Sequence, residues 1–210
     1  TKEANRQISQ RYRLKIKMYP FILNLCYRTY PDADIIETWT EITHEEKKSD
    51  HPQSFRFRLS AIRKGDVWVS HLYGSWANEA QLAQEPLRPG IKMIKNKDGI
   101  RNSHTAHAEV MISLDGKPKE NTGSVIGAAY AIAVTTNYSS IRMIATITIS
   151  LRELNEENSA YTLKAKESFR TPELALTYSK DGLSGSSPKF STHGQRKHKI
   201  ANGRPPGKSY

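Results

Sequence analysis

The sequence contains very little cysteine and no long apolar run. Cys26 is the only cysteine in 210 residues, which excludes an intramolecular disulfide and a zinc site built from cysteines. We expect Cys26 to be a small buried side chain in a strand. The longest apolar runs, such as residues 127–134, fall well short of the roughly 20 residues that a membrane-spanning helix needs, and no signal-peptide pattern is present. These features predict a soluble protein without a membrane partner, and they leave its compartment, cytoplasmic or periplasmic, undetermined.

Acidic residues are in the minority. The chain has 32 Lys and Arg against 21 Asp and Glu, a formal net charge of +11, and a basic balance raises the possibility of a nucleic-acid partner. Such a site requires basic residues on a folded face with aromatics among them. Here many lie beside turns or after Lys180, where Gly, Ser, Pro, Lys and Arg prevail and we expect a disordered basic tail. We therefore expect no nucleic acid as partner and keep a basic nucleic-acid-binding protein as an alternative.

Helical periodicity is also lacking, whereas short alternations of apolar and polar residues are common. This period of two predicts half-buried strands, and Asp115-Gly116 predicts a tight hairpin turn. Many short strands separated by turn residues indicate an all-β protein, an antiparallel β sandwich. The alternating sets are Val67, Val69, His71 and Tyr73; Val110, Ile112 and Leu114; Thr38, Thr40 and Ile42; and Leu174, Leu176 and Tyr178.

A metal or phosphate site has weak support. His104 and His107 are followed by Glu109, but a strand would place the two histidines on opposite faces. The tail residues His193 and His198 have no acidic neighbours. Gly207-Lys208-Ser209 matches the end of a phosphate-binding loop, but Gly203 is one position too close and no strand and helix flank it. We assign no metal ligand, no cofactor and no cofactor-binding residue.

Carboxylates and tryptophans are the other residues that could carry chemistry. A carboxylate pair could cleave a glycosidic bond, although exposed strand and turn positions commonly hold such residues, so we assign no catalytic residue. A tryptophan could stack on a sugar ring, although a buried aromatic on an inner sheet face is the commoner case. The carboxylates are Glu37, Glu41, Glu45, Glu46, Glu156 and Glu157, and the tryptophans are Trp39, Trp68 and Trp76.

Four stretches, in matching order and spacing, resemble the N-terminal region of glycoside hydrolase family 36 α-galactosidases, the melibiase group. They are DADIIETWTEITHEE (32–46), GDVWVSHLYGSWANEAQL (65–82), GIRNSHTAHAEVMISLDGKPKENTGSVIGAA (99–129) and NEENSAYTLKAKESFRTPELALTYSKDGLSG (155–185). The resemblance runs from about Leu23 to Gly185, with a weaker echo in residues 196–203.

The resemblance implies a supersandwich-type N-terminal domain at residues 1–185 and a tail at 186–210 that leads to a (β/α)₈ barrel. In that family two aspartates of the barrel remove terminal α-galactose from melibiose- and raffinose-type substrates, with retention and without a cofactor. Neither aspartate is in this chain. The barrel would begin just after Tyr210, and an acidic loop that reaches toward the sugar would precede Thr1. The resemblance also implies a homo-oligomer, often a tetramer, and a fragment that is inactive alone.

Three segments break the resemblance: HPQSFRFRL (51–59), YAIAVTT (130–136) and SPKFSTHG (187–194). A coding sequence for the family-like strand Val-Thr-Leu-Asn-Arg-Phe-Ala-Ser-Ala-Tyr, read in a shifted frame, yields residues 51–59. The family-like run Leu-Cys-Tyr-Ser-Gly-Asn-Tyr yields residues 130–136 in the same way. We hypothesise that the gene carries compensating insertions and deletions, or that its sequence contains errors. The replaced segments were never selected to pack, and Ser139–Leu151 would be an accidental strand with Ile141 and Ile149 on one face.

The sequence thus predicts an inactive α-galactosidase N-terminal domain, whose substrate in the complete enzyme is an α-galactoside. A stand-alone carbohydrate-binding sandwich that uses Trp39, Trp68 or Trp76 is the alternative from another class.

Overall fold

The computed structural model of the chain describes most of its strands. The described residues are 7–15, 21–45, 56–62, 65–95, 107, 109–130, 137–142, 146–152, 166–186 and 188–189, with only the backbone described for 56–62, 95, 137–142 and 146–152. Among these residues, no helix is both long and apolar enough to cross a membrane.

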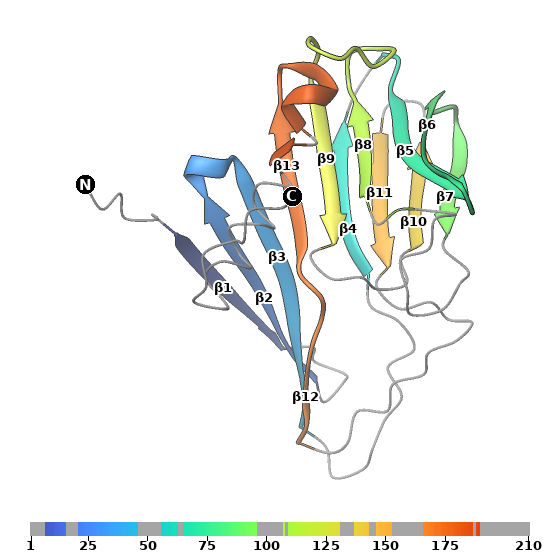
Figure 1. The fold of residues 1–210 in the computed structure, drawn as a ribbon. Helices are drawn as coiled ribbons and strands as arrows, with labels where there is room; N and C mark the ends of the chain where they lie inside the picture. Colours follow the sequence, from blue (N-terminus) through green and yellow to red (C-terminus); the bar gives the residue numbers. More distant parts are fainter. Residues whose placement is uncertain are drawn as a thin grey trace.

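Thirteen strands are described, in a large and a small sheet (Figure 1). The large sheet has the order β1 (Ile8–Lys15), β2 (Phe21–Tyr30), β3 (Ile35–His44), β13 (Leu174–Ser179), β9 (Val125–Tyr130), β8 (Glu109–Ser113), β5 (Trp68–Ser75) and β6 (Asn78–Pro86), and β12 (Ser168–Arg170) also pairs with β3. The small sheet has the order β4 (Arg56–Ile62), β11 (Thr146–Arg152), β10 (Asn137–Arg142) and β7 (Gly90–Lys95). A 3₁₀ turn, η1 (Pro31–Ala33), joins β2 to β3.

All pairings between these strands are antiparallel. The expected all-β antiparallel sandwich is therefore confirmed.

The hydrophobic core lies between the two sheets. Val69, Val110, Ala128 and Leu174 of the large sheet form one buried cluster with Ile94 of β7. The predicted alternations account for this cluster, because Val67, Val69, Val110, Ile112 and Leu174 come from three of them. Cys26 is 2% exposed within β2, which confirms the expectation of a small buried side chain.

The hairpin predicted at Asp115-Gly116 exists but is much longer than a tight turn. β8 pairs with β9, and residues 114–124 connect them. Gly116 has a φ of +101°, and its N–H donates to the Asp66 carbonyl at 2.8 Å. The loop is therefore anchored to the segment that precedes β5. The turn residues were identified correctly, whereas the loop length was wrong.

The segment Ser139–Leu151 forms two strands instead of one. β10 ends at Arg142 and β11 begins at Thr146, and the two pair antiparallel. In this register Ile141 is opposite Thr148 and Ser140 is opposite Ile149, so Ile141 and Ile149 occupy opposite faces of the small sheet. The side-chain parity therefore changes between the two strands, which an alternation count over the whole segment does not detect.

The first residues of the tail that we expected from Lys180 onward are structured instead. Residues 182–186 form a short helical turn, and the Leu183 and Ser184 N–H groups donate to the Lys119 and Glu120 carbonyls at 3.1 and 2.9 Å. Ser186 is fully buried. Residues 190–210 lie outside the described residues, as do 51–55 and 131–136, which make up much of the segments that break the resemblance.

Candidate functional site

Register divides the large sheet into two faces. Residues that are directly opposite each other on neighbouring strands share a face. Ile8, Thr29, Ile36, Leu176 and Ala128 form one such row. Because Ala128 belongs to the core cluster, this row defines the inner face.

A second row lies on the outer face. It consists of Arg28, Glu37, Ala175, Ala129 and Glu109. Side chains that the sequence analysis singled out, Glu37, Trp39 and Glu41, follow the parity of this face on β3. The candidate site is therefore on the outer face, around β2, β3 and β12.

Trp39 is the centre of this outer-face cluster. Only 7% of it is exposed, and the guanidinium carbons of Arg28 and Arg170 lie 5.0 and 4.5 Å from its ring centroid, within the range of cation–π attraction. Its indole N–H donates to Glu41 Oε1 at 3.2 Å. The ring is thus already covered by two arginines of the protein itself, so it does not offer a stacking surface for a sugar.

The buried carboxylate of Glu37 lies beside this tryptophan on the same face. Glu37 is 0% exposed. The Tyr30 hydroxyl donates to its Oε2 at 3.0 Å, and Arg28 Nη1 lies 3.8 Å from the same oxygen. Burial raises the pKa of Tyr30, and the hydrogen bond to Tyr30 raises the pKa of Arg28.

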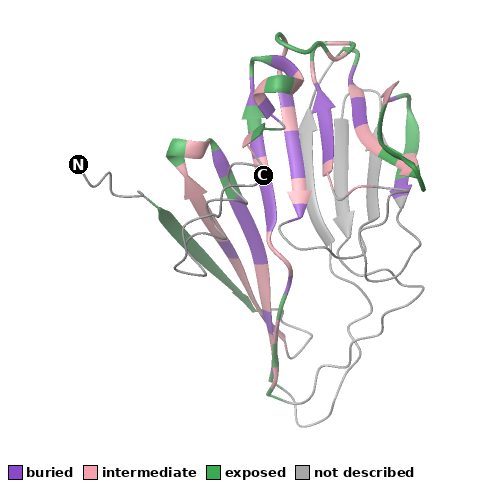
Figure 2. Cartoon of the chain, in the orientation of Figure 1, coloured by how far each residue is buried: buried purple, intermediate pink, exposed green. Residues whose placement is uncertain are grey.

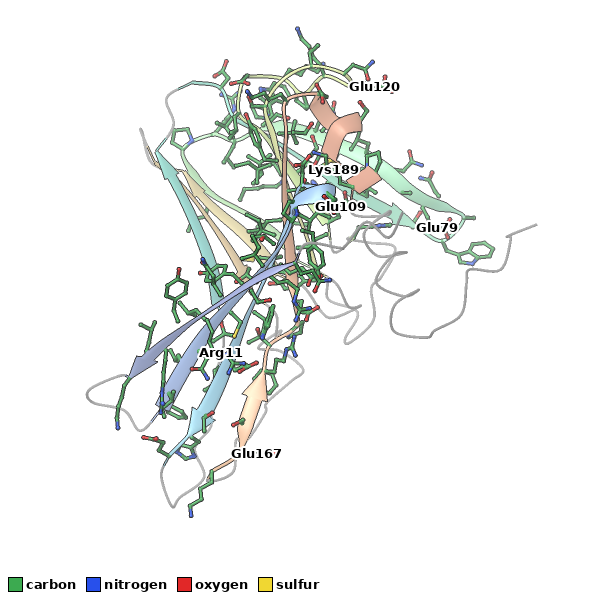
Figure 3. The ribbon with its side chains drawn as sticks, turned by 90° about the vertical axis from the view of Figure 1, so that its left-hand side faces the viewer. Arg11, Glu79, Glu109, Glu120, Glu167 and Lys189 are labelled. Carbon is green, nitrogen blue, oxygen red and sulfur yellow. The ribbon has the colours of Figure 1, made fainter. Side chains whose placement is uncertain are left out.

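Glu41 is paired in the same manner, with Arg11 Nη2 at 3.1 Å from its Oε2. Further along this surface, Arg170 forms an ion pair with Glu173. Figure 3 shows Arg11 on β1, beside this set of strands. The two carboxylates that could have acted as an acid pair, Glu37 and Glu41, are both bound to arginines and tie β1, β2 and β3 together. Glu45 is exposed, and Glu46, Glu156 and Glu157 lie outside the described residues.

The other two tryptophans lie on β5 and its hairpin to β6. Trp68 is half-buried, whereas Trp76 is 85% exposed. The hairpin tip is tightly built: Ala77 has a φ of +60°, and a Cβ on Gly74 would lie 2.6 Å from the Asn78 carbonyl. Glu79, labelled at this tip in Figure 3, accepts the Ala77 N–H at 3.3 Å. Of the three tryptophans, Trp76 is the one that presents its ring to solvent.

A cleft of about 780 Å³ lies beside the start of β3 and the end of β13, a volume in the range of small-molecule sites. Ile36, Leu176 and Tyr178 form part of its largely apolar wall. Lys189 closes one side, where its Nζ donates to Asp34 Oδ2 and to the Tyr178 carbonyl, each at 3.1 Å.

Of the residues considered for a metal site beside β8, the structure describes His107 and Glu109. His104 lies outside the described residues. His107 precedes β8, and its N–H donates to the Leu72 carbonyl at 3.1 Å. In the part of the chain that the structure describes, no three His, Cys, Asp or Glu side chains come together as a metal site.

The sequence analysis did not predict the burial of two histidines, His44 and His71. His44 is 0% exposed, neither ring nitrogen has a hydrogen-bond partner, and its ring stacks on Phe21 at 4.8 Å. His71 is half-buried on the inner face, where burial lowers its pKa. The alternation around His71 indicated its face, but no signal in the sequence indicated that His44 would be enclosed.

Comparison with known proteins assigns the chain to a family. Residues 10–132 match the profile of the glycosyl hydrolase family 36 N-terminal domain. The chain belongs to this family. This family 36 N-terminal domain is 30% identical over 127 residues to the bifunctional alpha-galactosidase/sucrose kinase AgaSK of Mediterraneibacter gnavus, covering 60% of the chain and 13% of that protein. It is 26% identical over 192 residues to alpha-galactosidase Mel36A of Lactobacillus acidophilus, covering 90% of the chain and 26% of that protein.

A solved structure supports the fold of the family 36 N-terminal domain. The alpha-galactosidase from Lactobacillus brevis superposes with a TM-score of 0.84 at 20% identity, over 93% of the chain and 26% of that structure. The chain therefore spans about a quarter or less of the length of these relatives.

Proposed function

We propose that this chain is the non-catalytic N-terminal domain of an α-galactosidase that hydrolyses terminal α-galactosyl residues of melibiose- and raffinose-type oligosaccharides, and that it is inactive alone. The observation that carries the proposal is the match of residues 10–132 to the family 36 N-terminal domain, together with relatives named as alpha-galactosidases. The chemistry of the outer face agrees with a scaffold, because Glu37 and Glu41 neutralise arginines.

An activity assay tests this proposal. The chain of residues 1–210 and the longer polypeptide encoded by its gene are assayed with a chromogenic aryl α-galactoside and with raffinose. We expect no hydrolysis by the chain alone and hydrolysis by the longer polypeptide. Hydrolysis by the chain alone that disappears in the Glu37→Gln variant would contradict the scaffold role.

The reading frame needs its own measurement. Deep resequencing of the gene across residues 51–59 and 130–136 shows whether insertions and deletions are present. If the frame is intact in the cell and encodes the family-like strands, the longer polypeptide must be made from that corrected sequence. If the shifts are confirmed, we expect the longer polypeptide to be inactive unless the frame is restored.

We propose a homo-oligomer as the state of the complete enzyme and no nucleic-acid partner for this domain. Light scattering on the longer polypeptide measures its oligomeric state, and a monomer would contradict the proposed homo-oligomer. Heparin chromatography addresses the second. Retention that disappears when residues after Lys180 are removed would assign the binding to the basic tail, whereas retention without the tail would favour a folded nucleic-acid site.

A carbohydrate-binding module is the second candidate, because Trp76 is 85% exposed and an exposed indole can stack on a sugar ring. Titration with galactosides, monitored by tryptophan fluorescence, tests it with Trp76→Ala as the control variant. Saturable quenching that the variant loses favours the module. An unchanged fluorescence favours the scaffold.

A further inference from the structure

The chain passes from the large sheet to the small sheet through a short connection between β6 and β7. β6 ends at Pro86, and β7 begins at Gly90. Between them Leu87 is 2% exposed, and its N–H donates to the Val67 carbonyl at 2.7 Å. We call the three segments that meet at this connection the sheet corner; they are residues 67–71, 83–87 and 90–94. β7 ends the small sheet and pairs with β10 on one side, so backbone pairing holds it from that side.

An ion pair links the two sheets at this corner. Lys92 Nζ of β7 lies 2.6 Å from Glu85 Oε1 of β6. Lys92 has the same parity on β7 as Ile94, which belongs to the core cluster, so Lys92 is on the side of β7 that faces the large sheet. Its side chain is 37% exposed and that of Glu85 is 39% exposed. The ion pair is therefore a connection between the sheets that water still reaches.

His71 lies beside this ion pair, on the same face of the large sheet as Glu85. Val69 is opposite Glu85 in the pairing of β5 with β6. His71 lies two residues further along β5, so Glu85 is its diagonal neighbour on one face. Nδ1 of His71 is buried and has no hydrogen-bond partner. Figure 2 shows β5 changing from buried near its start to exposed at the hairpin with β6, and His71 lies at this boundary, within reach of protons from solvent.

The charges that act on His71 come from the two partners of the ion pair. Burial lowers the pKa of the imidazole, the Glu85 carboxylate raises it, and the Lys92 ammonium lowers it. On β8 the residue opposite His71 is the apolar Val110. Among the described residues, Glu85 is thus the carboxylate placed to receive a charged imidazole.

Other titratable groups lie on the elements around His71 without a carboxylate among them. The ring of Tyr73, on the same strand, has its centroid 6.4 Å from that of His71. His107 adjoins β5 through the hydrogen bond of its N–H to the Leu72 carbonyl. Arg142 of β10 occupies the register position opposite Gly90. None of these groups offers an anion that could replace Glu85 at neutral or mildly acidic pH.

We propose that His71, Glu85 and Lys92 form a proton-driven switch at the sheet corner, in which a protonated His71 takes the Glu85 carboxylate from Lys92. With His71 neutral, Glu85 pairs with Lys92 and ties β6 to β7. Protonation adds a partly buried cation that is costly without an acceptor, and the three side chains then carry one excess positive charge. Lys92 gives way, because its ammonium is a point charge on a flexible stem. The link between the sheets opens, and the β7 edge loosens. This inference does not depend on the proposed function.

A histidine titration followed by NMR measures the competition for Glu85. The side-chain nitrogen signals of residues 1–210 are recorded between about pH 8 and pH 4.5, the range in which histidine titrates, and His71→Gln identifies the His71 signal. Lys92→Met should raise the His71 midpoint by about half a pH unit, the effect of one partly exposed charge. Lys95→Met removes the same charge from the opposite face of β7 and should leave the midpoint unchanged. Glu85→Gln should lower it.

Hydrogen exchange measures whether the link opens. The β7 amides, residues 90–95, are compared between the wild type and His71→Gln at the same pH, so that intrinsic exchange cancels. At about pH 7.5 we expect equal rates, and at about pH 5 we expect about threefold faster exchange in the wild type, the effect of losing one partly exposed ion pair. Lys92→Met should show the faster exchange at both pH values. The β8 amides, residues 109–113, report on the core and should change less.

Three results would overturn the proposal. A His71 midpoint that is unchanged in Lys92→Met, or raised equally in Lys95→Met, would show that Lys92 does not compete for Glu85. Equal β7 exchange in the wild type and His71→Gln at both pH values would show that the link is independent of the proton. Equal acceleration of the β7 and β8 amides would assign the pH effect to unfolding of the whole sandwich. Lys92→Gln repeats each measurement with a polar side chain, so that a packing effect of Met is recognised.

Discussion

The ion pair between Arg28 and Glu37 should respond asymmetrically to removal of either partner. The two side chains differ in environment: 28% of the Arg28 side chain is exposed, whereas Glu37 is fully buried. In Glu37→Gln, Arg28 can turn toward water and stays near Glu173. In Arg28→Met, a buried carboxylate loses its guanidinium and keeps the hydrogen bond from Tyr30. We therefore expect Arg28→Met to be the more destabilising substitution.

The separation of 3.8 Å sets the scale. At about 4 Å two unit charges attract by about 1 kcal/mol in water and about 4 kcal/mol at an effective dielectric constant of 20, and desolvation of Glu37 offsets much of this gain. Gln keeps the shape and an acceptor for Tyr30, so Glu37→Gln should cost about 1.5–2 kcal/mol, the low end of the range for a hydrogen bond to a charged group. Arg28→Met removes the guanidinium from beside a fully buried carboxylate and should cost about 3 kcal/mol or more.

Urea unfolding monitored by tryptophan fluorescence at about pH 7 and pH 5 measures both variants. Without the guanidinium, burial should favour the neutral form of the Glu37 carboxyl, so we expect the folded state to take up a proton before the unfolded state does as the pH falls. The deficit of Arg28→Met should therefore shrink toward pH 5. The double variant should cost less than the sum of the single ones. Equal costs for the two single variants, or a deficit of Arg28→Met that is independent of pH, would refute this account.

Three further substitutions test other buried groups. His44→Phe should raise the free energy of unfolding by about 1 kcal/mol, because it removes two buried nitrogens without partners and keeps the stacking on Phe21; a lower urea midpoint would contradict this. Gly182→Ala should lower the free energy of unfolding by about 3 kcal/mol, because a Cβ there would meet the Lys119 and Glu120 carbonyl oxygens at a φ of +66° and so combines backbone strain with overpacking. The control, Gly116→Ala, has a φ of +101° but open space and should cost less in the same unfolding assay; equal costs would disprove the clash. Burial lowers the pKa of His71, so the unfolded state takes up a proton first as the pH falls through about 6.5 and stability decreases there; His71→Gln should flatten this dependence between about pH 7.5 and 5.5, and an unchanged slope would show that His71 is not responsible.

The fold class and much of the core could be predicted from alternation alone. Val69, Val110, Ile112 and Leu174 are buried in one cluster, as the period of two indicates. Strand ends were harder to predict, because side-chain parity can change from one strand to the next, as it does between β10 and β11. The length of the loop after Ser113 depends on backbone contacts with Asp66, which are distant in the sequence.

The candidate site was less predictable than the fold. The sequence identified Trp39, Trp68 and Trp76 as equivalent candidates, and their exposures distinguish them only because of neighbours from other strands. Arg170 reaches Trp39 from β12, across more than a hundred residues. Pairing of Glu37 with Arg28 follows from the register of β2 and β3, which no local pattern determines. The resemblance, in contrast, depended on order and spacing, and the family assignment confirms it.

The unequal sheets have a consequence for the stability of the isolated chain. From β9 to β5 the large sheet has the small sheet opposite it (Figure 1), so its backbone pairing and its apolar burial stabilise the same residues. β1 is held to the sheet by its backbone hydrogen bonds with β2 and by exposed ion pairs such as Arg11 with Glu41. Exposed ion pairs contribute little to the free energy of unfolding. Because burial is the main source of folding free energy, the β1 edge should open first in residues 1–210.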